Sequence, residues 1–416
     1  MKQVYLDNQS NTKIDERVFE AMKPYFLEYY GNPQSIYSLG SVSKNAVEEA
    51  RKQAADFINA AAQEIIFTSC ATESNNLALK GIAEAYKSFG THIIVSAIEH
   101  ISILNAAKRL EKNGFNVTYL PVDSKGCVSE EELQKALKND TILVSIQTAN
   151  PEAGSIQNIK KLVSIVKSKS KAFFHTDAVS ACAMIPVDAA DWGVDALTFS
   201  ASVMYGPKGA AALYLKKGVK IAPQIEGGVQ ENSRRSGTEN VAAIAGFGKA
   251  CEIAKAETAQ NSAKMQILRD KLISELPKKI PYIYLNGGQE NRLPGNVNFS
   301  IEFVEGEALF LLLDAKAIMA ASGSACANKN LKISHVLTAM NVDVAVGQGS
   351  ILFTLSKYNT EEEINYLIDE FPSIVQRLRD MSPLYSHFLK TGNRMKAGPG
   401  TDYDDHDHCD TNCGLE

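Results

Sequence analysis

The sequence of 416 residues lacks any long apolar run. No stretch approaches the roughly 20 uninterrupted apolar residues that cross a membrane, and the first ten residues, MKQVYLDNQS, contain no apolar segment typical of a secretion signal. We therefore expect no membrane association and place the protein in the cytoplasm.

An excess of basic residues is also missing. The chain has 43 Lys and Arg against 48 Asp and Glu, a net charge of −5 and an isoelectric point near 5.9. Nucleic-acid binding depends on a broad positive field, so we expect small molecules and proteins as partners and no nucleic acid. The seven cysteines are too few and too irregularly spaced for a disulfide framework, which fits a reducing compartment.

From about residue 60 onward, short apolar runs rich in β-branched residues alternate with helix-like segments. This alternation predicts an α/β fold with a mostly parallel sheet covered by helices on both faces. Ligand sites in such sheets lie at the carboxyl ends of the strands, and the polar segments SCATESNN, AIEH and HTDAVS each follow one of the runs. The runs are EIIFTS, HIIVSAIEH, NVTYLPV, TILVSIQ, KAFFHTDA, ALTFS and AALYLKK.

Composition divides the chain into three parts. We predict a large α/β domain over residues 15–245, a smaller α+β domain made of residues 1–14 and 246–388, and an acidic tail over residues 389–416 that is expected to be disordered. The tail contains potential metal ligands, although an incidental set in a solvated tail explains them as well. These ligands are His406, His408, Cys409 and Cys413.

Three polar positions are candidates for chemistry. The turn from Cys70 to Asn75 precedes a helix, where free backbone N–H groups bind phosphate, although such a turn also serves only to cap a helix. We expect His100 and Asp177 each to end a strand, and each alone is explained as a capping or core residue. Together they suit a planar cationic heterocycle, with an imidazole stacked on the ring and a carboxylate paired with its nitrogen.

In the order of its motifs, the sequence resembles the NifS/IscS cysteine desulfurases. The resemblance implies fold type I of the pyridoxal-phosphate (PLP) enzymes: a large domain with a mostly parallel seven-stranded sheet flanked by helices, a smaller α+β domain carrying a cysteine loop, and a homodimer. It runs from residue 1 to about 385. The motifs are YLDNQSNT, YGNPQSIYSLG, TSCATESNNLA, SAIEHISIL, HTDAVSA, YGPKGAAALY, RRSGTEN and SGSAC.

The same resemblance implies the roles of particular residues. His100 would stack on the cofactor ring, Asp177 would pair with its nitrogen, and Thr238 would reach the phosphate held by the neighbouring subunit. Cys326 in SGSAC would take the sulfur of L-cysteine as a persulfide and deliver it to an IscU-like scaffold protein, whereas the plain alternative for Cys326 is a small buried hydrophobe. The implied catalytic residues are Cys326 and His100, and the implied cofactor-binding residues are Ala71, Thr72, His100, Asp177, Ser180, Ser200, Ser202 and Thr238.

The chain departs from the family pattern where the chemistry takes place. Val203 stands where the family has the lysine that binds PLP covalently, and valine has no amine for that link. Leu352 stands where an arginine clamps the substrate carboxylate, so a bidentate contact is lost. Further departures are Tyr37 and Ser202 for histidines, Pro151 for an asparagine and Ser180 for a glutamine.

These losses lead to one main expectation. We expect an IscS-like homodimer of iron–sulfur cluster assembly that docks a scaffold protein and presents Cys326 for sulfur transfer, or as a ligand to a [2Fe–2S] cluster shared with the scaffold. PLP would be noncovalent or weakly held. The alternative is an active desulfurase, converting L-cysteine to L-alanine and a persulfide, with noncovalent PLP or PLP linked to Lys208. A PLP enzyme for another sulfur or selenium amino acid is disfavoured by Leu352, because every amino-acid substrate has a carboxylate.

Overall fold

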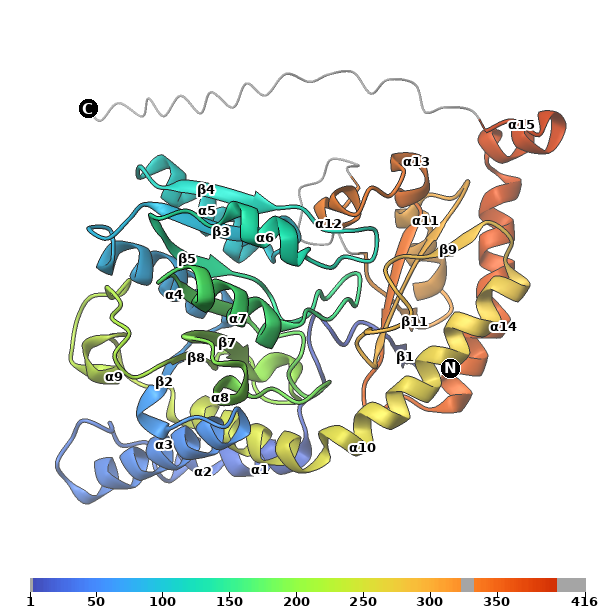
Figure 1. The fold of residues 1–416 in the computed structure, drawn as a ribbon. Coiled ribbons are helices and arrows are strands. Elements are labelled where there is room, and N and C mark those ends of the chain that lie inside the picture. Colours follow the sequence, from blue (N-terminus) through green and yellow to red (C-terminus); the bar gives the residue numbers. More distant parts are fainter. Residues whose placement is uncertain (1–2, 323–332, 395–416) are drawn as a thin grey trace, which may run out of the picture.

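The computed structural model describes residues 3–322 and 333–394 (Figure 1). Its largest element is a sheet of seven strands, and four of the six neighbouring pairs are parallel. The predicted α/β fold with a mostly parallel seven-stranded sheet is therefore confirmed. The strand order is β2 (Ile65–Thr68), β8 (Ala211–Leu215), β7 (Ala196–Ser200), β6 (Phe173–Asp177), β5 (Thr141–Ser145), β3 (His92–Ser96) and β4 (Asn116–Leu120).

The sheet has an apolar core on each face. Successive residues of a strand point to opposite faces, and on β3 Ile93 and Val95 enter one core whereas Ile94 enters the other. The first core is completed by helices α4 (Ala71–Ala85) and α5 (Ile101–Lys112). The second is completed by α3 (Ser38–Phe57), α6 (Glu130–Ala136), α7 (Ile159–Lys169), α8 (Ala189–Trp192) and α10 (Val241–Lys279).

All strands of this sheet except β8 run in one direction, so their carboxyl ends meet along one edge. Thr68, Ser96, Asp177 and Ser200 are the last residues of β2, β3, β6 and β7. This is the edge at which ligand sites form in open α/β sheets, and it is where the candidate residues lie.

A second sheet has three antiparallel strands in the order β12 (Ser350–Thr354), β10 (Asn296–Ile301) and β9 (Ile283–Leu285). Near it, β1 (Val4–Tyr5) pairs with β11 (Ile318–Met319), so the start of the chain lies beside residues more than 300 positions later. The helices of this part are α11 (Gly306–Asp314), α12 (His335–Ala339), α13 (Val344–Gly347) and α14 (Glu361–Asp380).

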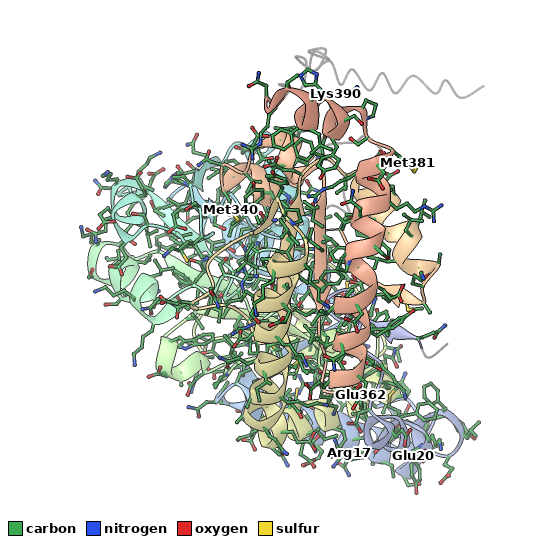
Figure 2. All side chains as sticks on the ribbon, turned by 90° about the vertical axis from the view of Figure 1, so that its right-hand side faces the viewer. Arg17, Glu20, Met340, Glu362, Met381 and Lys390 are labelled. Carbon is green, nitrogen blue, oxygen red and sulfur yellow. The ribbon has the colours of Figure 1, made fainter. Side chains whose placement is uncertain are left out.

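One helix links the two sheets. The 39 residues of α10 pack against α3 at one end of the helix and against α14 further along. Figure 2 shows α14 beside α10, with Glu362 and Met381 near opposite ends of α14. The domain boundary that we predicted after residue 245 falls inside α10, so the helix crosses it without a break.

The predicted tail begins too early in the chain. Residues 389–391 form the last turn of α15 (Pro383–Thr391), which is capped by Ser382 and ends at Gly392 with φ 70°. Phe388 of this helix stacks on Phe303 with ring centroids 5.0 Å apart, which gives the helix a packed side. Residues 395–416, with the four potential metal ligands, lie outside the described residues.

The remaining elements are short. They are α1 (Glu16–Met22), α2 (Pro24–Leu27), α9 (Gln230–Ser233) and the 3-10 turns η1 (Ala62–Glu64) and η2 (Ala201–Val203).

Candidate functional site

The amino end of α4 lies at the carboxyl end of β2. The helix begins at Ala71, and its N-cap residue, Cys70, has extended backbone and makes no side-chain capping bond. The first N–H groups of the helix therefore lack the side-chain acceptor that usually satisfies them. A phosphate suits this position, because the helix dipole and the N–H groups both favour an anion. Ala71 and Thr72 are the first two residues of this helix, and their role in phosphate binding stays a prediction.

Two hydroxyl groups lie at the end of β7. Ser200 is the N-cap of η2, and its Oγ lies 3.1 Å from Oγ of Ser202 and accepts from the Ser202 N–H at 3.5 Å. Ser200 is buried, whereas Ser202 is half-buried. The next residue, Val203, is 7% exposed, so the position expected to carry a cofactor-linked lysine carries a buried aliphatic side chain.

Asp177 ends β6, and both oxygens of its buried carboxylate accept hydrogen bonds. Oδ1 accepts from the Val179 N–H at 3.0 Å, and Oδ2 accepts from Nδ2 of Asn75 at 2.7 Å. Asn75 comes from α4, so the predicted phosphate-binding helix and the predicted ring-pairing carboxylate are directly joined. Asn75 was predicted only as the end of the turn that starts at Cys70, not as a residue of the site.

His100 is exposed and is the N-cap of α5, so the prediction that it ends a strand is wrong, because β3 already ends at Ser96 and a turn separates the two residues. Its Nδ1 lies 2.7 Å from Oγ of Ser102 and accepts from the Ser102 N–H at 3.2 Å. The Ser102 hydroxyl in turn accepts from Nδ2 of Asn75 at 2.9 Å. His100 also lines a groove of ≈ 250 Å³ between α4 and α5. The other residues that line it are Thr72, Asn76, Lys80, Ile101, Ser102, Asn105 and Ala106.

Leu352, on β12, occupies the position expected for a carboxylate-binding arginine. It is 5% exposed and pairs across the sheet with Asn298 of β10. Its backbone exchanges two hydrogen bonds with Ala321, of 2.9 and 3.1 Å. The backbone of Leu352 therefore holds the chain just before the segment that contains Cys326, while its side chain supplies no charge.

Two other departures from the family pattern are held by local contacts. Ser180 Oγ accepts a 3.0 Å hydrogen bond from Nε2 of Gln9, which belongs to the segment after β1. Asn150 Oδ1 accepts from the backbone N–H groups of Glu152 and Ala153, at 2.9 and 2.7 Å, so the turn around Pro151 is fixed by the preceding amide.

Two buried glutamates border the site. Burial raises the pKa of Glu99, next to His100, to about 8 and that of Glu152 to about 7. One oxygen of each carboxyl group, Oε2 of Glu99 and Oε1 of Glu152, has no hydrogen-bond partner in the described part of the chain. A buried polar atom without a partner costs about 1–3 kcal/mol. Neither glutamate was predicted as a site residue, because a single acidic residue after a strand carries no distinctive pattern.

Some predicted residues are not brought together here. Thr238 and Lys208 are exposed, and Tyr37 is 56% exposed as the N-cap of α3. Cys326 lies outside the described residues.

Over residues 3–322 and 333–394, no group of three or more His, Cys, Asp or Glu side chains is placed to hold a metal ion. No helix in these ranges is both long and apolar enough to cross a membrane.

Comparisons with known proteins identify the fold family. The family model described as aminotransferase class-V matches residues 4–367. The chain is 49% identical over 382 residues to a protein named cysteine desulfurase IscS from Dictyoglomus turgidum, covering 92% of this chain and 97% of that one. The protein of the same name from Methanosarcina thermophila is 49% identical over 383 residues, covering 92% and 94%.

Two solved structures are similar over most of the chain. A NifS-like protein has a TM-score of 0.85 and 40% identity, covering 90% of this chain and 100% of that one. A structure titled SspA in complex with cysteine has a TM-score of 0.76 and 31% identity, covering 86% and 100%.

Proposed function

The chain belongs to the aminotransferase class-V family as an IscS-like cysteine desulfurase, and from this premise we propose a member that transfers sulfur with its lysine-dependent chemistry impaired. The observation that carries the proposal is Val203, buried at 7% exposure in the turn after β7. Without an amine at this position, the cofactor of the family has no residue to link to there.

The residues that are present fit part of PLP. The uncapped amino end of α4 and the hydroxyls of Ser200 and Ser202 suit a phosphate, and the carboxylate of Asp177 suits a protonated ring nitrogen. When bound, PLP supplies an electron sink for chemistry at the α-carbon of an amino acid. The chain would thus hold PLP noncovalently, through its phosphate and ring.

Substrate binding is weakened as well. Leu352 places an aliphatic side chain where a carboxylate of L-cysteine would need a cation, and it is 5% exposed. A bidentate arginine would both bind and orient a carboxylate. We infer that free L-cysteine is bound poorly and is not oriented for reaction.

The cofactor part of the proposal is tested with the purified protein. It is incubated with PLP, treated with borohydride or left untreated, and desalted. We expect the absorbance of PLP to be lost in both samples and little sulfide to be released from cysteine and a reductant. A retained chromophore with sulfide release that Cys326→Ser abolishes would instead establish a desulfurase.

The second part of the proposal concerns Cys326 and the scaffold. We propose that the chain docks an IscU-like scaffold protein and presents Cys326 as a persulfide carrier or as a ligand to a [2Fe–2S] cluster shared with it. As a carrier, the Cys326 thiolate would attack the outer sulfur of a persulfide donor and release the thiolate of that donor. The support is that the chain keeps this cysteine while losing the lysine and the arginine. With iron, the scaffold and a persulfide donor supplied, Cys326→Ser should abolish cluster formation on the scaffold, and Cys127→Ser, at a half-buried cysteine outside the site, is the control. Unchanged cluster formation in Cys326→Ser would refute it.

We also propose a homodimer. Large apolar side chains are exposed near the amino terminus, among them Phe26 at 58%, Leu27 at 84%, Tyr30 at 72% and Ile36 at 100%. Several large exposed apolar side chains close together in the sequence suit a protein contact. In a dimer, the exposed Thr238 would reach the phosphate site of the partner subunit, and both sites would then be complete.

A working desulfurase is the alternative. The retained Ser200, Ser202 and Asp177 favour it, because they still suit PLP. The cofactor would be noncovalent or linked to Lys208, which is exposed five positions after Val203. A borohydride-fixed adduct that maps to Lys208 would establish the linked form.

A further inference from the structure

Asn75 and Ser102 connect two residues of the site that are far apart in the sequence. We propose that these two side chains form a hydrogen-bond relay between Asp177 and His100, and that the relay fixes His100 as the tautomer with its proton on Nε2. The proposal concerns side chains of this chain alone and rests on the proposed function only for the identity of the ligand.

The relay begins at the carboxylate of Asp177. A carboxylate only accepts hydrogen bonds, so the Asn75 atom 2.7 Å from Oδ2 must be the amide nitrogen. The other oxygen of Asp177 accepts from the Val179 N–H at 3.0 Å, which fixes the orientation of the carboxylate. The direction of the Asn75 amide is therefore determined.

The second amide hydrogen continues the relay. It points to Oγ of Ser102 at 2.9 Å, so this oxygen acts as an acceptor and its own hydrogen is available for Nδ1 of His100 at 2.7 Å. The Ser102 N–H also donates to Nδ1, at 3.2 Å. A ring nitrogen that accepts from two donors cannot carry a proton, so the proton of the neutral ring lies on Nε2.

Asn75 contributes hydrogen bonds through the two N–H groups of its amide and none through its buried oxygen. The residue is completely buried, and its Oδ1 has no hydrogen-bond partner among the described residues. A buried acceptor without a partner destabilises the fold. An apolar side chain would avoid that cost, but it would leave both Asp177 and Ser102 without the donor that Asn75 supplies.

The relay suits the proposed ligand. A neutral imidazole stacks on a cationic ring without the repulsion that an imidazolium would suffer. Nε2 of His100 has no hydrogen-bond partner in the described part of the chain and remains available to donate to a ligand, and the residue lines the groove between α4 and α5. Asn75 and Ser102 are thus positioning residues. They keep the proton of His100 on Nε2, which then acts as the hydrogen-bond donor.

The test reads the tautomer directly. Protein labelled with ¹⁵N-histidine and free of PLP is examined by long-range ¹H–¹⁵N NMR, and the signal of His100 among the seven histidines is assigned by its loss in His100→Gln. We expect a pyridine-type shift for Nδ1 and a pyrrole-type shift for Nε2. The measurement needs no bound cofactor, so a protein that never binds PLP still tests the relay.

Variants test the two relay residues separately. In Ser102→Ala and in Asn75→Leu, the two nitrogen shifts of His100 should move toward each other, because the second tautomer becomes accessible. Asn113→Leu is the control, since Asn113 is exposed at the far end of α5 and belongs neither to the relay nor to the groove that His100 lines. It should keep the shifts of the parent protein.

Two results would overturn the proposal. One is a proton on Nδ1 in the parent protein, and the other is unchanged shifts in both Ser102→Ala and Asn75→Leu. If Asn75→Leu fails to fold by circular dichroism, Ser102→Ala, which removes one oxygen atom, decides the outcome alone.

Discussion

The hydroxyl of Ser334 donates a 2.5 Å hydrogen bond to Oε2 of Glu152. Ser334 is also the N-cap of α12, where its Oγ accepts from the Val336 N–H at 3.1 Å. One side chain therefore caps the helix that follows the segment containing Cys326 and joins it to the turn after β5. Because Glu152 is 3% exposed, the protonation state of its carboxyl group affects the stability of the fold and the hydrogen bond to Ser334.

The first prediction concerns the pH dependence of stability. Burial raises the pKa of Glu152 to about 7 and that of Glu99 to about 8, from 4.5. Between 4.5 and these values the folded state binds more protons than the unfolded state, so the free energy of unfolding falls as pH rises and levels off above about pH 8. Each unit of pKa corresponds to about 1.4 kcal/mol, so urea unfolding from pH 5 to 9 should reveal a loss of a few kcal/mol.

Glutamine variants identify the source of that loss. Glu152→Gln and Glu99→Gln remove the ionisable groups and keep the side-chain carbonyl, so each should flatten its part of the pH profile and stabilise the protein at pH 9. Glu290→Gln, at an exposed position, should change nothing. A profile that stays equally steep in the double glutamine variant would contradict the assignment.

A lysine at position 203 should restore covalent binding of PLP. Val203→Lys places an amine in the turn beside Ser200 and Ser202, where the retained phosphate site would hold the cofactor. After borohydride treatment and desalting, we expect at least about tenfold more bound cofactor than in the parent protein, and peptide mass spectrometry should map it to residue 203.

Val203→Met controls for the length of the new side chain. Methionine fills a similar volume without an amine, so it should retain no fixed cofactor. An equal amount of fixed PLP in both variants would show that attachment occurs elsewhere in the chain.

Activity should need two changes together. Leu352→Arg alone places a cation at a position that is 5% exposed and should lower the free energy of unfolding by about 3 kcal/mol. Val203→Lys/Leu352→Arg supplies both the amine and the carboxylate clamp, and sulfide release from cysteine should rise at least about tenfold above either single variant. Adding Cys326→Ser to the double variant should abolish that release. Equal rates in the single and double variants would argue against a role for position 352.

The exposed apolar surface near the amino terminus should control assembly. Leu27→Asp and Ile36→Asp place charges on side chains that are 84% and 100% exposed, so a dimer formed there should dissociate while the fold persists. Analytical ultracentrifugation measures the change. Phe89→Asp, at a 76% exposed position away from this surface, should leave the dimer intact. A dimer that survives all three changes would place the interface elsewhere.

Sequence patterns predicted the sheet and much of its functional edge. Apolar runs ended by polar residues correctly placed Asp177 and Ser200 at the carboxyl ends of strands, because strand direction and burial are local properties. The start of α14 also carries a local signal, since Thr360 and Glu363 form a capping box. The predicted role of Cys326 stays a prediction.

The sequence did not indicate the contacts between segments that lie far apart in the chain. Asn75 and Asp177 are 102 positions apart, and Gln9 and Ser180 are 171 apart, so neither pair leaves a local pattern. Asn75 lies in α4 rather than in the turn that we predicted, and its segment is equally typical of a simple helix start. The side chain became a site residue only when folding brought α4 against β6.

The length of α10 has a consequence for how the molecule unfolds. Its 39 residues pack against α3 beside one sheet and against α14 and β10 beside the other. One apolar core, which includes Ile94 of the larger sheet and Phe299 of the smaller, also spans both parts. Melting either part would strip one end of a continuous helix and open the shared core, so calorimetry should record a single cooperative heat-absorption peak rather than two.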